Sequence, residues 1–138
     1  MTSFDILFQT NRFNLSEVKE RFINPCCFGE DLAEWLREQL AKKGVSADAP
    51  YQEDWGWEML ARQGSQGYFL GATGYPSEGA VDKNDGEWRI MVETRRSIWE
   101  KLRGKNKISE TDPMLSIIED ILREQADVRN MSREFMSL

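Results

Sequence analysis

Residues 55–62 read WGWEMLAR, and their side chains alternate in character along the chain. One face of an extended chain would carry Trp55 and Trp57, and the other face would carry Glu58. A period of two is typical of a β-strand that has one covered face. The pattern therefore predicts a strand at 55–62 with both tryptophans on the same side.

Three other segments alternate in the same way, at 4–10, 68–73 and 87–95. Such patterns favour antiparallel strands with one face buried. Gly71 lies within the second of these segments, and Gly74 follows it directly. A glycine within a strand leaves room for a large neighbour, and we expect tryptophans of the adjoining strands to occupy that room.

Two segments, 30–43 and 113–126, predict amphipathic helices because apolar residues recur in them every three or four positions. Shorter helices are predicted at 14–23 and 97–103, each opened by residues that fit a capping box. We expect both longer helices to pack on the same face of the sheet.

These elements together predict an α+β fold. We expect a two-layer sandwich, in which an antiparallel sheet of about four strands is covered by helices on one face. The chain has 138 residues, a length typical of one domain, so we interpret 1–138 as a single domain. Residues 127–138 show no clear pattern, and we expect a loosely docked tail there.

Composition and charge exclude several classes of protein. The net charge is −6 at pH 7, which argues against binding to nucleic acid or to a membrane surface. No apolar run approaches the ~18 residues that a membrane span needs. The chain has no histidine, so we expect no metal site and no cofactor, and we assign no catalytic residue.

The cysteines, Cys26 and Cys27, are adjacent in the sequence. Adjacent residues have poor geometry for a disulfide, so we expect free thiols, as in a reducing compartment. Residues 1–5 lack the basic and apolar regions of a secretion signal. The sequence thus predicts a cytoplasmic protein.

Acidic and aromatic residues gather at the start of the strand predicted at 55–62. The candidate binding residues are Glu53, Asp54, Trp55, Trp57 and Glu58. Two interpretations are open. Either the tryptophans pack in the core, or they form a recognition platform flanked by the acids.

Carboxylate pairs offer a further reading of the same region. Glu58 and Glu93, on facing strands, could form a tuned pair for acid–base chemistry, as could Glu53 and Asp54. Arg62 and Arg89 are predicted to lie on the same face of the sheet as Glu58 and Glu93. Cross-strand ion pairs with these arginines explain the charges more simply than catalysis does.

Charge is unevenly distributed along the chain. Residues 29–58 carry a net charge of −5, and residues 89–107 carry +5. Either the two segments are solvated faces of a soluble protein, or the first forms an acidic docking patch on a dipolar molecule.

The run GEDLAEWL at 29–36, followed by EDWGW at 53–57, resembles the pattern of a small bacterial protein family. The similarity extends over about residues 24–95. It implies that the tryptophan segment is a signature of that family. It brings no activity, cofactor or site residue that could be transferred.

We therefore expect a non-enzymatic protein-interaction module, of the immunity, inhibitor or chaperone-like kind, that binds a basic partner protein. A homodimer is compatible with this expectation. The alternative is a small ligand-binding protein, or a carboxylate-based enzyme, with a pocket lined by tryptophan. A deep cleft beside Glu53 and Asp54 would favour the alternative, and a flat acidic surface would favour the interaction module.

Overall fold

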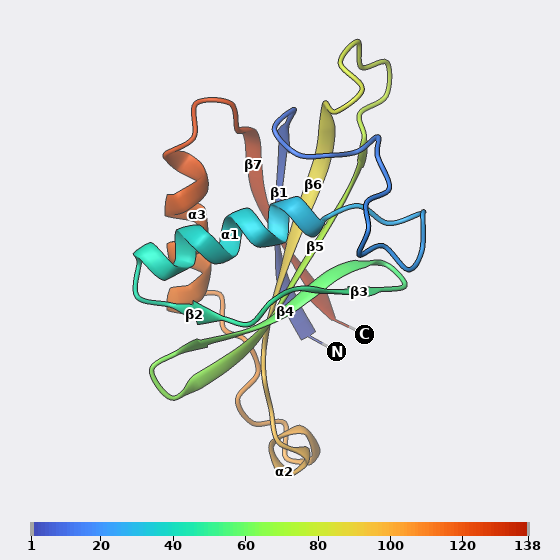
Figure 1. Cartoon of the computed structure of the whole chain (residues 1–138). Coiled ribbons are helices and arrows are strands. Elements are labelled where there is room, and N and C mark those ends of the chain that lie inside the picture. The colour runs from blue at the N-terminus through green and yellow to red at the C-terminus, as the bar shows by residue number, and fades with distance from the viewer. Residues whose placement is uncertain (1, 138) are drawn as a thin grey trace.

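The computed structural model describes residues 2–137 and shows an α+β fold built on a seven-stranded sheet (Figure 1). The strands are β1 (Thr2–Thr10), β2 (Ser46–Ala47), β3 (Tyr51–Glu53), β4 (Gly56–Gln63), β5 (Gln66–Pro76), β6 (Gly86–Thr94) and β7 (Arg129–Ser137). The helices are α1 (Glu30–Lys42), α2 (Ile98–Leu102) and α3 (Pro113–Arg123). The strand order is β2-β4-β5-β6-β1-β7, with β3 also paired to β4, and the strand pairs are antiparallel.

One face of the sheet forms the core, together with α1 and α3. Helix α1 contacts β4 and β5, and α3 contacts β1 and α1. Leu36 of α1 and Ile118 of α3 are buried in the same hydrophobic cluster as Trp57 and Trp88 of the strands. The expectation that both longer helices pack on one face is confirmed, and Figure 1 shows α1 crossing that face. We call this face of the sheet the inner face.

The predicted capping signals fix the starts of α2 and α3. Asp112 caps α3 by accepting a hydrogen bond from the backbone N–H of Met114, and Pro113 occupies the first turn. Ser97 and Glu100 form the predicted capping box of α2. None of the helices within residues 2–137 is long and apolar enough to cross a membrane.

The sheet is larger than the predicted four strands. Strands β2 and β3 have only two and three residues, too few to show a period. Residues 129–137 form β7, which pairs along β1, where the sequence suggested a loosely docked tail. This edge strand is mostly exposed, so its sequence lacks the apolar alternation that would reveal it.

The helix predicted at 14–23 is wrong. The Asn14 side chain does accept hydrogen bonds from the N–H groups of Ser16 and Glu17, as an N-cap would, but only turns and bends follow. Leu15 is buried and Phe22 packs against the core, but Val18 and Ile23 are 54% and 82% exposed, so the four residues do not form one apolar stripe. A helix of two turns gains little stability unless a whole apolar face is buried, which is not the case here.

The expectation of free thiols is also wrong, because Cys26 and Cys27 form a disulfide. The bond lies in the irregular segment between β1 and α1, next to the turn that joins β3 and β4, where the carbonyl oxygen of Asp54 lies 3.0 Å from Cys27 Sγ. Disulfides are typical of oxidising compartments. The argument for a cytoplasmic location from reduced cysteines therefore no longer holds.

Candidate functional site

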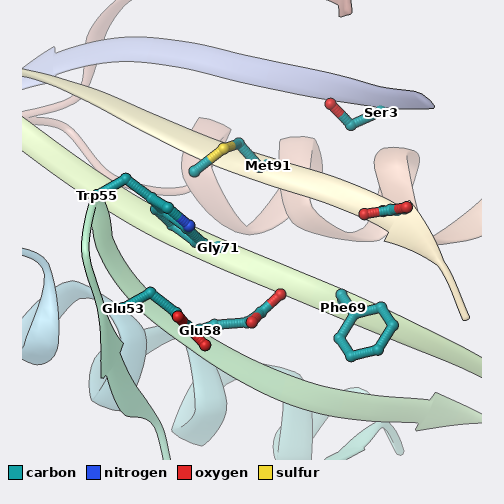
Figure 2. Close-up of a pocket in the computed structure, with 8 residues that line it drawn as sticks. Ser3, Glu53, Trp55, Glu58, Phe69, Gly71 and Met91 are labelled. Atoms are coloured by element: carbon teal, nitrogen blue, oxygen red, sulfur yellow. The ribbon is translucent and has the colours of Figure 1, made fainter. Parts of the chain in front are cut away.

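A pocket of about 370 Å³ opens on the outer face of the sheet, opposite the helices (Figure 2). Its apolar walls are Trp55, Phe69 and Met91, and its charged groups are Glu53, Glu58 and Glu93. These side chains come from β4, β5, β6, the end of β3 and the turn between β3 and β4. The volume is within the range of ligand pockets.

Gly71 creates the hollow. In the register of the sheet, Gly71 of β5 lies between Glu58 of β4 and Met91 of β6. A Cβ atom at Gly71 would lie 2.7 Å from the Trp55 ring and 2.9 Å from Met91 Cε. The missing side chain thus leaves room for the edge of the Trp55 ring, and Figure 2 shows the indole beside Gly71.

The backbone holds Trp55 in this position. Strand β4 begins at Gly56, one residue later than predicted, and Trp55 belongs to the tight turn after β3. Thr73 Oγ1 donates a hydrogen bond of 2.8 Å to the carbonyl oxygen of Trp55. Trp55 is 41% exposed on the outer face, whereas Trp57 is 1% exposed on the inner face.

The prediction that both tryptophans share one face is therefore wrong, because the turn removes Trp55 from the strand period. Trp57 is a core residue, and its indole N–H donates a hydrogen bond of 3.0 Å to the carbonyl oxygen of Cys27. Asp54 is exposed at the tip of the turn and does not line the pocket. Of the five candidate residues, the structure brings together Glu53, Trp55 and Glu58.

Burial shifts the acid–base properties of two pocket glutamates. Partial burial raises the pKa of Glu58, and the nearby charges of Glu53 and Glu93 raise that pKa further. The hydroxyl of Tyr51 opposes this shift by donating a hydrogen bond of 2.9 Å to Glu58 Oε2. Burial likewise raises the pKa of Glu93, against the opposing influence of Arg96 and Lys101.

Tyr51 is a donor that stays protonated. Burial, the hydrogen bond to Glu58 and the charge of Glu58 raise its pKa to about 12. At neutral pH the Tyr51 hydroxyl is therefore uncharged, and it holds the Glu58 carboxylate in place by donating a hydrogen bond.

The predicted cross-strand ion pairs are absent from the pocket. Arg62 pairs with Asp48 at 3.4 Å, and Arg89 pairs with the buried Asp5. Within residues 2–137, none of the three pocket glutamates forms a salt bridge. Strand β5 also separates β4 from β6, so Glu58 and Glu93 are not direct cross-strand neighbours.

The wider acidic segment at 29–58 is not one patch. Arg21 forms salt bridges with Glu30 and Glu34 at one end of α1. Asp31 accepts a hydrogen bond of 2.6 Å from the backbone N–H of Asn14. Within residues 2–137, Glu53 and Glu58 lie together on the outer face without a salt bridge, while the exposed Glu38 and Asp54 lie elsewhere.

Sequence reasoning missed the apolar walls supplied by Phe69 and Met91. Their signal was present in the alternation, because both share the outward parity of Glu93 in β5 and β6. Phe69 and Met91 could not be recognised as pocket walls, because the sequence pattern does not place Trp55 on the outer face with them. No group of three or more Cys, Asp or Glu side chains within residues 2–137 is arranged to hold a metal ion.

Comparison of the chain with protein-family models, with curated proteins and with solved structures finds no match. The family resemblance at 29–57 therefore gains no support, and the argument for function depends on the pocket itself.

Proposed function

We propose that the protein is a binding protein whose pocket receives a cationic group, a lysine or arginine side chain, from a basic partner protein. The observation that carries this proposal is the set of three glutamates, Glu53, Glu58 and Glu93, around an apolar wall with no salt bridge among the described residues. Partial burial raises the pKa of Glu58 and of Glu93, and a cation bound between the carboxylates would relieve that cost.

The shape of the pocket suits a cation carried on an apolar stem. The aliphatic part of a lysine or arginine would lie against Phe69 and Met91, as long charged side chains do on apolar surfaces. The face of an indole attracts a cation within about 6 Å, so Trp55 would add to the attraction of the carboxylates. An inhibitor-type or immunity-type protein is one class that would use such a site against a basic partner.

A free organic amine has the same chemistry and is the second candidate. The hollow favours it, because a concave site can enclose a small molecule. The two sources can be separated with two probes, a pentalysine peptide and butylamine. A protein partner predicts that the peptide binds much more tightly, whereas a small-molecule site predicts similar affinity for both.

The test uses the adjacent residues Glu53 and Asp54 as a matched pair. Both changes, Glu53→Gln and Asp54→Asn, remove one negative charge, but only Glu53 lines the pocket. We expect Glu53→Gln to weaken pentalysine binding about tenfold, the cost of one lost ion pair in a partly desolvated site, and Asp54→Asn to change it little. Calorimetry at two salt concentrations provides the measurement.

Equal losses in the two variants would mean that only the overall negative charge matters, and would overturn the proposal. If the protein turns over a substrate and Glu58→Gln abolishes that turnover, the protein is a carboxylate-based enzyme and the proposed binding function is wrong. Melting temperatures of both variants should stay close to that of the native protein, since otherwise the comparison reports folding.

A further inference from the structure

Helix α2 exposes three large apolar side chains. None of its residues is buried, and Ile98, Trp99 and Leu102 are 69%, 66% and 73% exposed. Figure 1 shows α2 beyond the end of the sheet, apart from the other elements. Single exposed apolar residues are ordinary, but three on one short helix form a surface that suggests an interaction.

The segment that carries α2 is held in a defined conformation. The capping box of Ser97 and Glu100 fixes its start. Thr94 Oγ1 donates a hydrogen bond to the carbonyl oxygen of Asn106, and Ile108 is buried beyond it. Both ends of residues 95–107 are therefore tied to the sheet, and the apolar side chains project between them.

Positive charge surrounds this projection. Residues 95–107 contain six basic side chains and one acid, Glu100, whose carboxylate serves the capping box. The six are Arg95, Arg96, Lys101, Arg103, Lys105 and Lys107. Within the part of the chain that the structure describes, none of the six forms a salt bridge, whereas nine of the other twelve lysines and arginines do.

We propose that α2 and the basic residues of 95–107 dock on the surface of an anionic lipid bilayer. Trp99, Ile98 and Leu102 would enter the boundary between head groups and acyl chains, where an indole is favoured. The unpaired lysines and arginines would remain at the level of the lipid phosphates and carboxylates, which attract basic clusters.

The projecting shape of α2 favours a lipid bilayer over a protein or a nucleic acid as the binding partner. A lipid surface adapts to a projecting apolar tip, whereas a protein partner would need a matching cavity. Nucleic acid would use the basic side chains but would leave Ile98 and Leu102 in water. The net charge of −6 does not oppose this docking, because charges more than about 8 Å away are screened at physiological salt and the local charge is positive.

The test measures co-sedimentation of the full chain with vesicles. One set contains phosphatidylcholine alone, and the other contains about one third phosphatidylserine. We expect binding to the anionic vesicles that is at least about tenfold stronger than to the neutral ones and that decreases as salt increases.

Two double variants test the two parts of the surface. Trp99→Ala with Leu102→Ser removes the apolar tip, and Arg103→Gln with Lys105→Gln removes two charges that do not line the pocket. We expect each double variant to weaken binding about tenfold or more, because one basic residue near an anionic surface contributes roughly fivefold. All the changed residues are exposed, so the fold should persist, as circular dichroism will show.

Matched controls come from exposed residues elsewhere. Ile23→Ser with Val81→Ser and Lys19→Gln with Lys83→Gln should leave vesicle binding unchanged. Equal loss in the controls, or no binding to anionic vesicles, would overturn the proposal. Binding of a DNA oligonucleotide that depends on Arg103 and Lys105 but not on Trp99 and Leu102, without vesicle binding, would identify a polyanion site instead.

Discussion

The inner and outer faces of the sheet use the same strands for opposite purposes. The inner face is apolar and fully covered, with Trp57, Trp88 and Ile90 at most 1% exposed. The outer face carries Trp55 at 41% exposure beside glutamates whose pKa values are raised by partial burial. One face therefore stabilises the fold, while the other retains groups that a purely structural surface would lack.

Two glycines of β5 show the contrast most directly. Gly74 faces inward, where a Cβ would lie 2.3 Å from a ring carbon of the buried Trp88. Gly71 faces outward, where a Cβ would lie 2.7 Å from the edge of the partly exposed Trp55 ring. Both glycines accommodate a tryptophan, but only the inner tryptophan, Trp88, is buried. Substitutions on the two faces should therefore differ in kind as well as in size.

The largest effect should come from emptying a site beneath the inner face. Leu36→Ala removes a side chain that is 1% exposed, and we expect it to lower the free energy of unfolding by about 2–5 kcal/mol through lost burial and a residual cavity. Denaturant unfolding gives the measurement. The outer-face comparison is Phe69→Ala, which should cost less because Phe69 is only partly buried. Similar losses in both variants would contradict the distinction between the faces.

The glycine pair should give the next largest difference. Gly74→Ala forces a methyl group against a ring that cannot move, so we expect a loss of about 1–3 kcal/mol from overpacking. Gly71→Ala meets only the far ends of the partly exposed Trp55 and Met91 side chains, so we expect less than about 1 kcal/mol. The same change should displace Trp55 and narrow the pocket, which a loss of pentalysine binding would report. Equal destabilisation would show that Trp55 is held as rigidly as Trp88.

The smallest effect should come from substitutions of the pocket glutamates. Unlike the changes above, these should increase the stability of the folded protein. A pKa that is higher in the folded protein than in the unfolded chain means that the folded state binds the proton more tightly. Stability therefore falls as pH rises from the ordinary glutamate pKa of 4.5 through the raised value, and then stays level.

Glu58→Gln or Glu93→Gln should remove this loss. We expect either variant to raise the melting temperature at pH 7. The gain in the free energy of unfolding should be less than about 1 kcal/mol, because solvent screens both partly exposed groups. The gain should shrink as pH falls towards 4. Glu78→Gln, at an exposed glutamate outside the pocket, is the matched charge control. A lower melting temperature at pH 7 for both pocket variants would contradict the claim that burial of these carboxylates destabilises the folded protein.

Local patterns predicted much of the inner face. The alternation in β4, β5 and β6, the stripe of α1 and the caps of α2 and α3 all agree with the sequence. These signals are strong because burial imposes them on every second residue of a strand or every third and fourth residue of a helix. Two exposed segments were not predicted correctly: the edge strand β7 shows no alternation, and the capping signal at 14–23 is followed by no helix.

The candidate site was predicted only in part. Glu53, Trp55 and Glu58 were recognised as a cluster because they are close in sequence, and Glu93 was considered only as a partner of Glu58. The sequence could not exclude Asp54 and Trp57, because a single turn decides which side of the sheet each residue of the segment 53–57 occupies. The basic projection around α2 was visible as a charge excess at 89–107, but not as an exposed apolar surface.

The sequence by itself determined the class of fold, the inward parity of the core strands and the two helices that cover them, because these depend on periodic burial along the chain. Only the tertiary structure decided that Trp55 and Trp57 lie on opposite faces and that β5 separates Glu58 from Glu93. It also decided that Cys26 and Cys27 are joined and that residues 129–137 complete the sheet. Apart from the disulfide between adjacent cysteines, each of these depends on strand order or on one tight turn, which bring together groups whose spacing in the sequence carries no period.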